Sequence, residues 1–453
     1  MEKIIFRKIH FVMFVVVLAW VVIGCRHDYI TKGGDSGTAS ACEACHTNYT
    51  LLKEVYTPDT APPPGGCGGT APHYEPYDRV YMGGDNYEAF KATSHYPLGC
   101  KYCHKGDDQS NDKATAHSGD FIRHPSMFAE EKCGSCHPDI VADAATSLHH
   151  GTGQKRKVTM RSGLAGPEEF DQLAQGKITG YNVNCATCHG TCGNCHIVRP
   201  PIAGGGLAKA HNFTRNPDML NTCISCHTSR GGHAYLGRDP NADPDIHLTK
   251  AGFECIDCHS GAEIHGNGEP VDHRYAYSEL PTCTSSKCHS GLETSNTYHS
   301  THYTDFNCHV CHSQDYNTCG SCHIHGDGAR FGPYQDFKIA LNPIKDVKPD
   351  YNFALVRRTL AAPDNWEVYN VPDYENFEAF PTYNYTTPHN IQRWTSRTNQ
   401  SGTCYSNCHI RNDGGTLVNV ELYLWTDSLE VWEVDATSSI CVDGQLPGGW
   451  FTK

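Results

Sequence analysis

The chain has little of the apolar material from which a protein of its length builds a layered core. Only 38% of its 453 residues are hydrophobic, whereas glycine and proline contribute 43 and 25 residues. Patterns typical of long amphipathic helices are scarce, so a conventional layered domain is not expected over most of the chain. Methionine is limited to six residues. The formal net charge is −14, so a nucleic-acid partner is not expected.

Cysteine, by contrast, is abundant and occurs in one repeated pattern. Nine Cys-x-x-Cys-His motifs are joined by two longer versions, with four and three residues between the cysteines, and we number these eleven units in chain order. Their cysteines are Cys42 and Cys45, Cys100 and Cys103, Cys133 and Cys136, Cys185 and Cys188, Cys192 and Cys195, Cys223 and Cys226, Cys255 and Cys258, Cys283 and Cys288, Cys308 and Cys311, Cys319 and Cys322, and Cys404 and Cys408. Their histidines are His46, His104, His137, His189, His196, His227, His259, His289, His312, His323 and His409.

Cys-x-x-Cys-His is the attachment signature of a c-type haem. Its two thiols bond to the porphyrin edge, and the histidine supplies one axial ligand to the iron. A zinc site, a redox dithiol or a disulfide gives no reason for a histidine after every second cysteine. The longer spacings of units 8 and 11 are less usual for attachment. The repeats therefore predict eleven haem c groups, each with its iron.

The second axial ligand separates an electron carrier from an enzyme, because an open position on iron can bind a substrate. Of the 29 histidines, eleven belong to the units, and the rarity of methionine favours histidine on both sides of the iron. Seven histidines lie a short distance before a unit and are the first candidates: His95, His124, His211, His247, His273, His302 and His389. The next candidates are His117, His149 or its neighbour His150, His265 and His299, and His309 inside unit 9 is a further one. The sequence does not pair them with haems.

The spacing of the units predicts the fold class. Ten units fall between Cys42 and His323, which leaves about 28 residues for each haem, too few for a core of protein alone. We expect a multihaem cytochrome of mostly coil and short helices wrapped around stacked haems, with a small, possibly β-containing C-terminal cap. Only Gly190 and Thr191 separate units 4 and 5, so those two haems are expected to be in contact.

The N-terminal segment is typical of an exported protein. Lys3, Arg7 and Lys8 precede an apolar run from Phe11 to Ile23, and Gly24-Cys25 follows. Residues 1–24 are expected to be a lipoprotein signal peptide, with Cys25 carrying the lipid, although Val22 stands where leucine is usual. Residues 25–41 are expected to form a flexible tether. The expected location is the outer membrane, on the cell surface or the periplasmic face.

Two stretches outside the units carry further expectations. Residues 138–184 form a haem-free insertion with a basic patch, Lys155-Arg156-Lys157, which is expected to lie in a solvated loop or to serve as a docking spot. The multihaem domain is expected over 42–330 with haems 1 to 10, and an aromatic-rich cap over 331–453 with haem 11. In the cap, Val418–Trp425 suggests a strand, with Leu429–Val434 as its partner or as a helix. Cys67 and Cys441 are left for a disulfide.

The repeated units, the scattered histidines and the lipoprotein start resemble the multihaem c-type cytochromes of bacteria that respire external acceptors. The resemblance implies an electron-transfer wire between a periplasmic cytochrome or a porin–cytochrome complex and an external acceptor such as a metal oxide. Two alternatives remain. One is a reductase of a small oxyanion of the nitrite, hydroxylamine or tetrathionate type, and the other is a subunit of a cytochrome filament. No catalytic residue is assigned.

Overall fold

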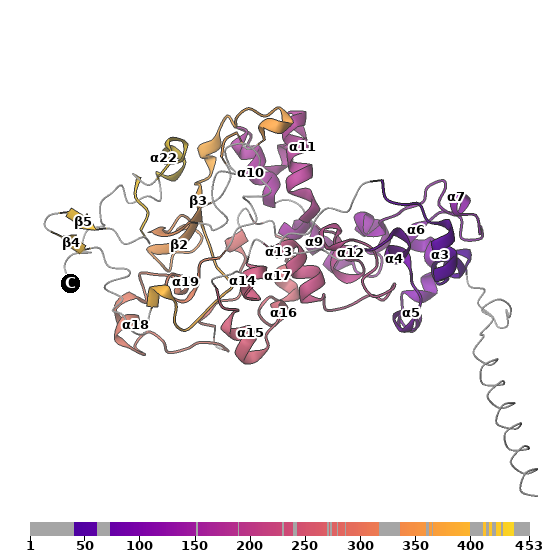
Figure 1. Cartoon of the computed structure of the whole chain (residues 1–453), viewed down its shortest axis with the longest axis horizontal. Coiled ribbons are helices and arrows are strands. Elements are labelled where there is room, and N and C mark those ends of the chain that lie inside the picture. The colour runs from indigo at the N-terminus through magenta and orange to yellow at the C-terminus, as the bar shows by residue number, and fades with distance from the viewer. Residues whose placement is uncertain are drawn as a thin grey trace, which may run out of the picture.

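The computed structural model shows an elongated molecule in which short helices follow one another from the N-terminal end to a small β-sheet (Figure 1). Helices α3 to α7 lie at one end, and strands β4 and β5 lie near the other. The structure describes residues 40–60, 73–150, 153–188, 190–228, 231–238, 242–269, 271, 274–278, 280–285, 287–316, 336–358, 362–364, 366–398, 411–413, 416–418, 423–426 and 429–438. The predicted signal peptide, Cys25, Cys67, Cys441 and units 10 and 11 lie outside these residues.

Short helices dominate the described chain. The α-helices are α2 (Ala41–His46), α3 (Tyr49–Val55), α4 (Pro76–Val80), α5 (Asp85–Lys91), α6 (Cys100–His104), α7 (Lys113–Ala116), α8 (Ala129–Lys132), α9 (Pro138–Thr146), α10 (Gly153–Arg161), α11 (Gln175–Asn184), α12 (Cys192–His196), α13 (Ile224–His227), α14 (Gly232–Tyr235), α15 (Ile246–Ala251), α16 (Cys255–Cys258), α17 (Gly261–His265), α18 (Thr297–His302), α19 (Cys308–His312) and α22 (Val431–Thr437). Single turns of 3₁₀ helix are η1 (Tyr96–Leu98), η2 (Pro125–Phe128), η3 (Leu148–His150), η4 (Pro167–Gln172), η5 (Ala186–Cys188), η6 (Pro201–Ala203), η9 (Arg274–Ala276), η11 (Glu367–Tyr369), η12 (Phe377–Ala379) and η13 (Ser396–Thr398), and η7 (Met219–Cys223) is a π turn.

Helix caps define many of these short elements. Ser40 and Glu43 form a capping box at α2, in which the Ser40 hydroxyl accepts from the backbone N–H of Glu43. The side chain of Asn307 caps α19 by accepting from the backbone N–H of Val310. Because helices of one or two turns are unstable in isolation, such caps and tertiary contacts hold them in place.

Residues 153–184 fold into helices, which corrects the prediction of a solvated loop around Lys155–Lys157. That patch lies on α10, which packs with η4 and α11 around Val158, Phe170, Leu173 and Tyr181. The Lys155 ammonium lies 4.9 Å from the Phe170 ring centre, and the Arg156 guanidinium lies 5.3 Å from that of Phe380. The aliphatic stems of such cations cover apolar surface, so this patch is part of a packed helical layer.

The C-terminal sheet has three antiparallel strands in the order β1 (Phe337–Leu341), β2 (Phe353–Arg358) and β3 (Tyr383–Tyr385). In the register, Ile339 lies opposite Leu355, and Val356 lies opposite Tyr385. Since side chains alternate along a strand, Phe353 and Leu355 face one layer and Ala354 and Val356 face the other. The first layer includes Val310 of unit 9, so the sheet supports the helix that carries that unit.

The strands predicted near the C-terminus are placed differently in the structure. Strand β5 (Thr416–Val418) pairs with β4 (Arg411–Asp413), while Tyr423 at the end of the predicted strand bridges to Ile339 of β1. Of the two alternatives for residues 429–434, a partner strand or a helix, the structure has the helix, because α22 begins at Val431. A capping box of Glu430 and Glu433 starts this helix, and the fully buried Glu433 forms an ion pair with Arg358 of β2.

The C-terminal segment also reaches back to the units. Ile391 bridges to Ser313, immediately after unit 9, and its backbone N–H donates to Asp245. Arg397 forms an ion pair with Asp315. Residues beyond the predicted domain boundary at 331 are therefore part of the structure around the units.

Candidate metal centres

The Cys-x-x-Cys-His units adopt local structures that bring their three functional side chains together. Units 1, 2, 5 and 9 lie on α2, α6, α12 and α19, and in unit 3 the N–H of His137 donates to the carbonyl of Cys133 (2.9 Å). Residues three and four apart share one face of a helical turn, so the two thiols and the imidazole point to one side. In unit 8, whose cysteines are further apart, the N–H of His289 also donates to the carbonyl of the first cysteine, Cys283, although this residue lies six positions earlier (3.1 Å).

Within the described residues, eight unit histidines lie opposite a second histidine from elsewhere in the chain. The pairs are His46 with His117, His104 with His211, His137 with His95, His196 with His265, His227 with His149, His259 with His389, His289 with His247, and His312 with His299. Each second histidine is one that the sequence suggested as an axial ligand. Only in the His299 pair does the ligand serve the unit that directly follows it.

The separation of the paired rings is nearly constant although their relative orientation varies. Ring centres lie 6.0–6.1 Å apart in all eight pairs, while interplanar angles run from 23° to 73°. Parallel rings in direct contact come much closer, as His95 and Phe213 do at 4.1 Å and 8°. The histidine pairs are therefore held apart by a fixed distance rather than packed on each other.

That distance fits two imidazoles on opposite sides of one metal ion. A histidine nitrogen binds a transition metal at about 2 Å, and the ring centre lies about 1 Å behind it, which places the two centres about 6 Å apart. Hydrogen bonds orient the rings for this role. The Nδ1 atom donates to a backbone carbonyl in His46 (Val80, 3.0 Å), His104 (Ile122, 2.9 Å), His117 (Lys113, 2.7 Å), His196 (Thr214, 2.7 Å) and His312 (Gln392, 3.2 Å). The lone pair of Nε2 is thereby left for a metal.

Burial keeps many of these imidazoles neutral, which is the form that binds metal. It lowers the pKa of His46, His95, His104, His149, His265, His312 and His389 from the ordinary value, and it lowers the pKa of His211 to about 4. His247 is an exception, because its hydrogen bond to Asp245 raises its pKa. Desolvation disfavours the charged imidazolium in the first group, and the carboxylate favours it in His247.

The cysteines of different units approach one another and place the units in order. Three pairs of thiols lie close enough to shift each other's pKa: Cys223 with Cys255, Cys188 with Cys226, and Cys283 with Cys308. Others lie within electrostatic range: Cys42 with Cys100, Cys103 with Cys133, Cys133 with Cys192, Cys195 with Cys223, and Cys258 with Cys283 and Cys288. Units 1, 2, 3, 5, 6, 7, 8 and 9 thus form a continuous row, and unit 4 joins it at unit 6.

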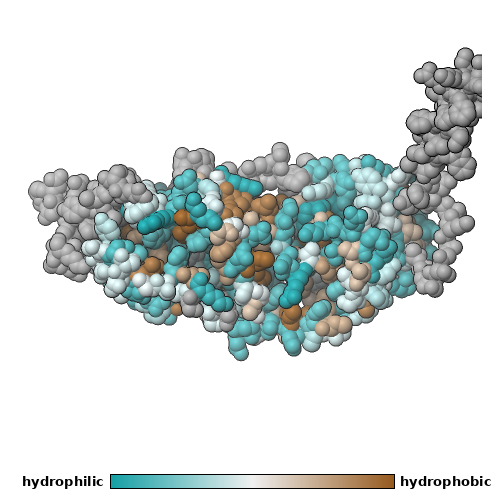
Figure 2. Space-filling model, turned by 90° about the horizontal axis from the view of Figure 1, so that it is seen from below, coloured by the Kyte–Doolittle hydropathy of each residue, from teal (hydrophilic) through white to brown (hydrophobic). Residues whose placement is uncertain are grey.

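Large apolar side chains are exposed beside the units. Figure 2 shows hydrophobic patches scattered over a mainly hydrophilic face. Among the exposed residues are Leu98 before unit 2, Val183 before unit 4, Leu220 before unit 6 and Phe253 before unit 7. An exposed apolar surface at a recurring position marks a place that another apolar group can cover.

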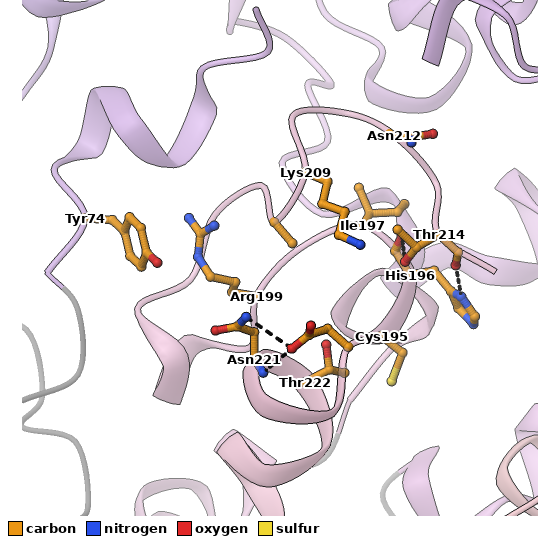
Figure 3. A pocket seen from close by; sticks show the side chains of 12 residues that line it. Tyr74, Cys195, His196, Ile197, Arg199, Lys209, Asn212, Thr214, Asn221 and Thr222 are labelled. Carbon is orange, nitrogen blue, oxygen red and sulfur yellow. Dashed lines mark hydrogen bonds between the residues drawn. The ribbon is translucent and has the colours of Figure 1, made fainter. Parts of the chain in front are cut away.

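A polar pocket adjoins unit 5. Cys195 and His196 line it together with Arg199, Lys209 and Asn221 (Figure 3). The Arg199 guanidinium stacks on Tyr74, 3.7 Å from the ring centre, and its Nε donates to the Gly205 carbonyl (3.1 Å). Two cations and one carboxylate, Asp218, line this pocket, so its lining carries a net positive charge that favours an anionic group.

Four suggested axial ligands are not among the eight pairs, namely His124, His273, His302 and His309, and neither is His150, the alternative to His149. His124 lies just before Ser126, whose hydroxyl hydrogen-bonds Thr191 between units 4 and 5 (2.6 Å). His302 lies one turn after His299 on α18 and contacts Phe306, with ring centres 5.6 Å apart. His273 and the histidine of unit 4, His189, lie outside the described residues. Burial lowers the pKa of His309 to about 3.

Sequence reasoning missed the carboxylates that hold two of the paired histidines. The Nδ1 atom of His259 lies 2.8 Å from Glu263 Oε1, and that of His247 lies 2.8 Å from Asp245 Oδ1. His259 lies outside the helices, directly after α16, and Glu263 lies in the first turn of α17, so helical spacing does not relate the two residues. Asp245 is the N-cap of α15, two residues before His247. Neither contact follows from a local spacing rule.

Comparison with protein-family models, with curated proteins and with solved structures finds no match to this chain. Within the part of the chain that the structure describes, no helix has the length and apolar character needed to cross a bilayer.

Proposed function

We propose that the chain is an electron-transfer protein that carries one haem c on each of its eleven units. The observation that carries this proposal is the set of eight histidine pairs with ring centres 6.0–6.1 Å apart, each including the histidine of a Cys-x-x-Cys-His unit. In each unit the two cysteines would hold the porphyrin edge as thioethers, and the paired imidazoles would bind the iron from both sides.

The surroundings of the units suit such a group. Apolar side chains beside the units would cover the porphyrin faces, and Arg199 and Lys209 would pair with propionates near unit 5. Haem c supplies a one-electron couple at each unit. Because two imidazoles would hold the iron at each of these eight units, the protein residues favour electron transfer over substrate binding there.

The order of the units supports a wire. From unit 1 to unit 9, leaving out unit 4, the cysteines of neighbouring units lie within electrostatic range of one another. Attached porphyrins would therefore follow one another without an intervening protein layer. This continuity favours a conduit that accepts electrons at one end and delivers them at the other.

The proposed setting is the bacterial outer membrane, with Cys25 as a lipidated anchor on the cell surface or the periplasmic face. The proposed partners are a periplasmic cytochrome or a porin–cytochrome complex on one side and an extracellular acceptor such as a metal oxide on the other. The net charge of −14 supports partners with a basic or metal-ion surface and none of nucleic acid.

The proposal is tested by haem content and electron paramagnetic resonance. The mature protein is expected to bind eleven haems, with low-spin ferric iron at the eight paired units. His211→Ala should convert one site to high-spin iron, and His211→Met should keep it low-spin while raising its potential. His73→Ala is the matched control, because His73 is exposed and contacts Glu75. A haem content far below eleven, or an unchanged spectrum of His211→Ala, would contradict the proposal.

A further inference from the structure

The paired histidines differ in the group that accepts the hydrogen bond from Nδ1. At units 1, 2, 5 and 9 the acceptor for the unit histidine is a neutral backbone carbonyl, from Val80, Ile122, Thr214 and Gln392. At unit 7 the acceptor for the unit histidine is a side-chain carboxylate, and at unit 8 a carboxylate accepts from the second histidine of the pair, His247. The kind of acceptor does not follow from the spacing of the cysteines or from the distance between the paired rings.

At unit 7 the carboxylate comes from α17. Glu263 reaches the Nδ1 atom of His259 with both oxygens, at 2.8 Å and 2.9 Å. Its backbone N–H donates to Ser260, the N-cap of α17, and its side chain is only 14% exposed. The helix start therefore fixes the carboxylate beside the imidazole, and little solvent screens the two groups.

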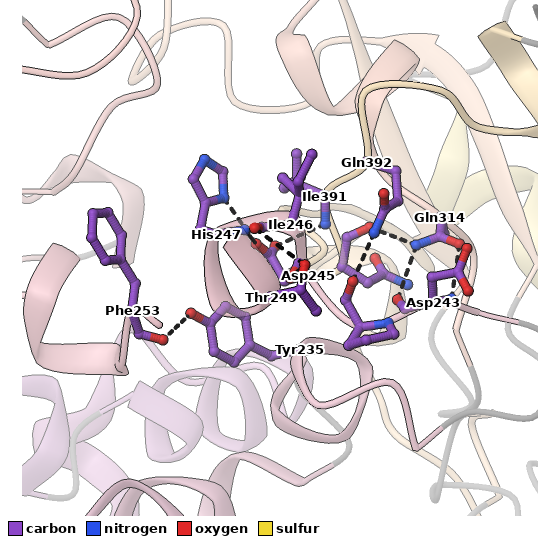
Figure 4. Close-up of polar contacts among 12 residues, drawn as sticks. Tyr235, Asp243, Asp245, Ile246, His247, Thr249, Phe253, Gln314, Ile391 and Gln392 are labelled. Atoms are coloured by element: carbon purple, nitrogen blue, oxygen red, sulfur yellow. Dashed lines mark hydrogen bonds and ion pairs between the residues drawn. The ribbon is translucent and has the colours of Figure 1, made fainter. Parts of the chain in front are cut away.

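At unit 8 the carboxylate is more deeply buried. The side chain of Asp245 is 3% exposed, and its Oδ1 accepts from both the backbone N–H (2.7 Å) and Nδ1 (2.8 Å) of His247. Its Oδ2 accepts from the backbone N–H of Ile391 at 2.8 Å (Figure 4). Because His389, two residues before Ile391, faces His259, Asp245 also anchors the segment that serves unit 7.

A carboxylate on Nδ1 acts on the metal through the imidazole. It draws the Nδ1 proton towards itself, so that Nε2 becomes a stronger donor to iron. A stronger donor, together with a nearby negative charge, stabilises the ferric over the ferrous state. A backbone carbonyl has the same direction of effect but no net charge, and the effect is correspondingly smaller.

We propose that Glu263 and Asp245 are positioning residues that lower the reduction potentials of the iron sites at units 7 and 8 below those of units 1, 2, 5 and 9. Cys258 of unit 7 lies in electrostatic range of Cys283 and Cys288 of unit 8, so the two sites are neighbours. The inference rests on the proposed haem content. It adds that the row contains a low-potential step between unit 6 and unit 9.

The experiment is a redox titration of the full haem-loaded protein, followed by electron paramagnetic resonance. The two sites give different signals, because the ligand planes of unit 7 are 25° apart and those of unit 8 are 64° apart. Near-parallel planes give a rhombic low-spin spectrum, whereas strongly crossed planes give a single signal at high g. Glu263→Gln keeps an oxygen that can accept from Nδ1 and removes the charge. It should increase the reduction equilibrium constant of one rhombic site about tenfold, or about 59 mV for one electron.

Glu254→Gln is the matched control, because it removes an exposed carboxylate at the N-cap of α16, beside the same unit. It should shift the same site much less, since solvent screens its charge. Asp245→Asn is the second variant. It should raise the reduction potential of one crossed-plane site, as Glu263→Gln does for one rhombic site. A Glu263→Gln shift no larger than that of Glu254→Gln, with haem content intact, would overturn the inference. A wild-type chain that is purified without haem would instead refute the proposed function.

Discussion

The two parts of the molecule differ in where their apolar contacts come from. Around the sheet, large apolar side chains such as Ile339, Leu355 and Leu424 are shielded from solvent almost completely. Between residues 40 and 316, outside the cluster around Val158 and Phe170, the buried apolar residues are dispersed, and side chains such as Val183 and Leu220 remain exposed beside the units. The sheet region has a core of its own, whereas the unit region has surfaces that suit a bound apolar group.

This contrast shows how one chain combines two ways of gaining stability. In the sheet, strand pairing and alternating side chains bury apolar area within the polypeptide. In the unit region, short capped helices and histidine pairs position ligands, and the proposed porphyrins would supply most of the apolar area. The sheet meets the second region at α19, where Val310 of unit 9 packs on Phe353 and Leu355.

The largest effect is expected when the full chain is produced without haem attachment. Residues 40–316 should lose most of their amide protection, because their helices are short and their own apolar core is small. The strands over 336–358 should keep protected amides, because their core is made of side chains. Hydrogen exchange followed by mass spectrometry measures both regions in one sample. Equal protection of residues 73–150 with and without haem would break the comparison.

A smaller effect is expected from a cavity in the sheet core. Leu355 is fully buried at the centre of β2, so Leu355→Ala should lower the local unfolding free energy of the strands by about 3 kcal/mol. Exchange of the strand amides measures this change, and haem content should stay the same. Leu341→Ala is the control, because Leu341 is exposed at the end of β1 and should cost less than about 0.5 kcal/mol. If Leu355→Ala lost haem as well as amide protection of the strands, the two regions would not be independent in stability.

The smallest effect is expected at the cap of the first unit. Ser40→Ala removes the hydroxyl that accepts from Glu43, and α2 should lose about 1 kcal/mol of stability. Exchange of the amides over 41–46 measures the change. Ser118→Ala, at an exposed serine that donates to the Thr115 carbonyl, should leave those amides unaffected. An α2 that exchanges at the wild-type rate in Ser40→Ala would show that the bound group, rather than the cap, holds this helix.

Much of the secondary structure outside the units was not predictable from the sequence. The basic patch Lys155-Arg156-Lys157 predicts a solvated loop or a docking spot, but it lies on α10, where contacts with Phe170 and Phe380 stabilise the helix. The sequence left residues 429–434 open between a strand and a helix, and the capping box and the Arg358 ion pair stabilise the helix. Both outcomes depend on residues distant in the chain.

The sequence by itself determined which residues form each unit, because two thiols and an imidazole on one turn are related by local spacing alone. It also supplied the set of histidines from which the eight partners are drawn. Only the tertiary structure decided that His389 faces His259 and that Glu263 and Asp245 hold two of the rings. Contacts between distant segments depend on the path of the whole chain, which no local pattern encodes.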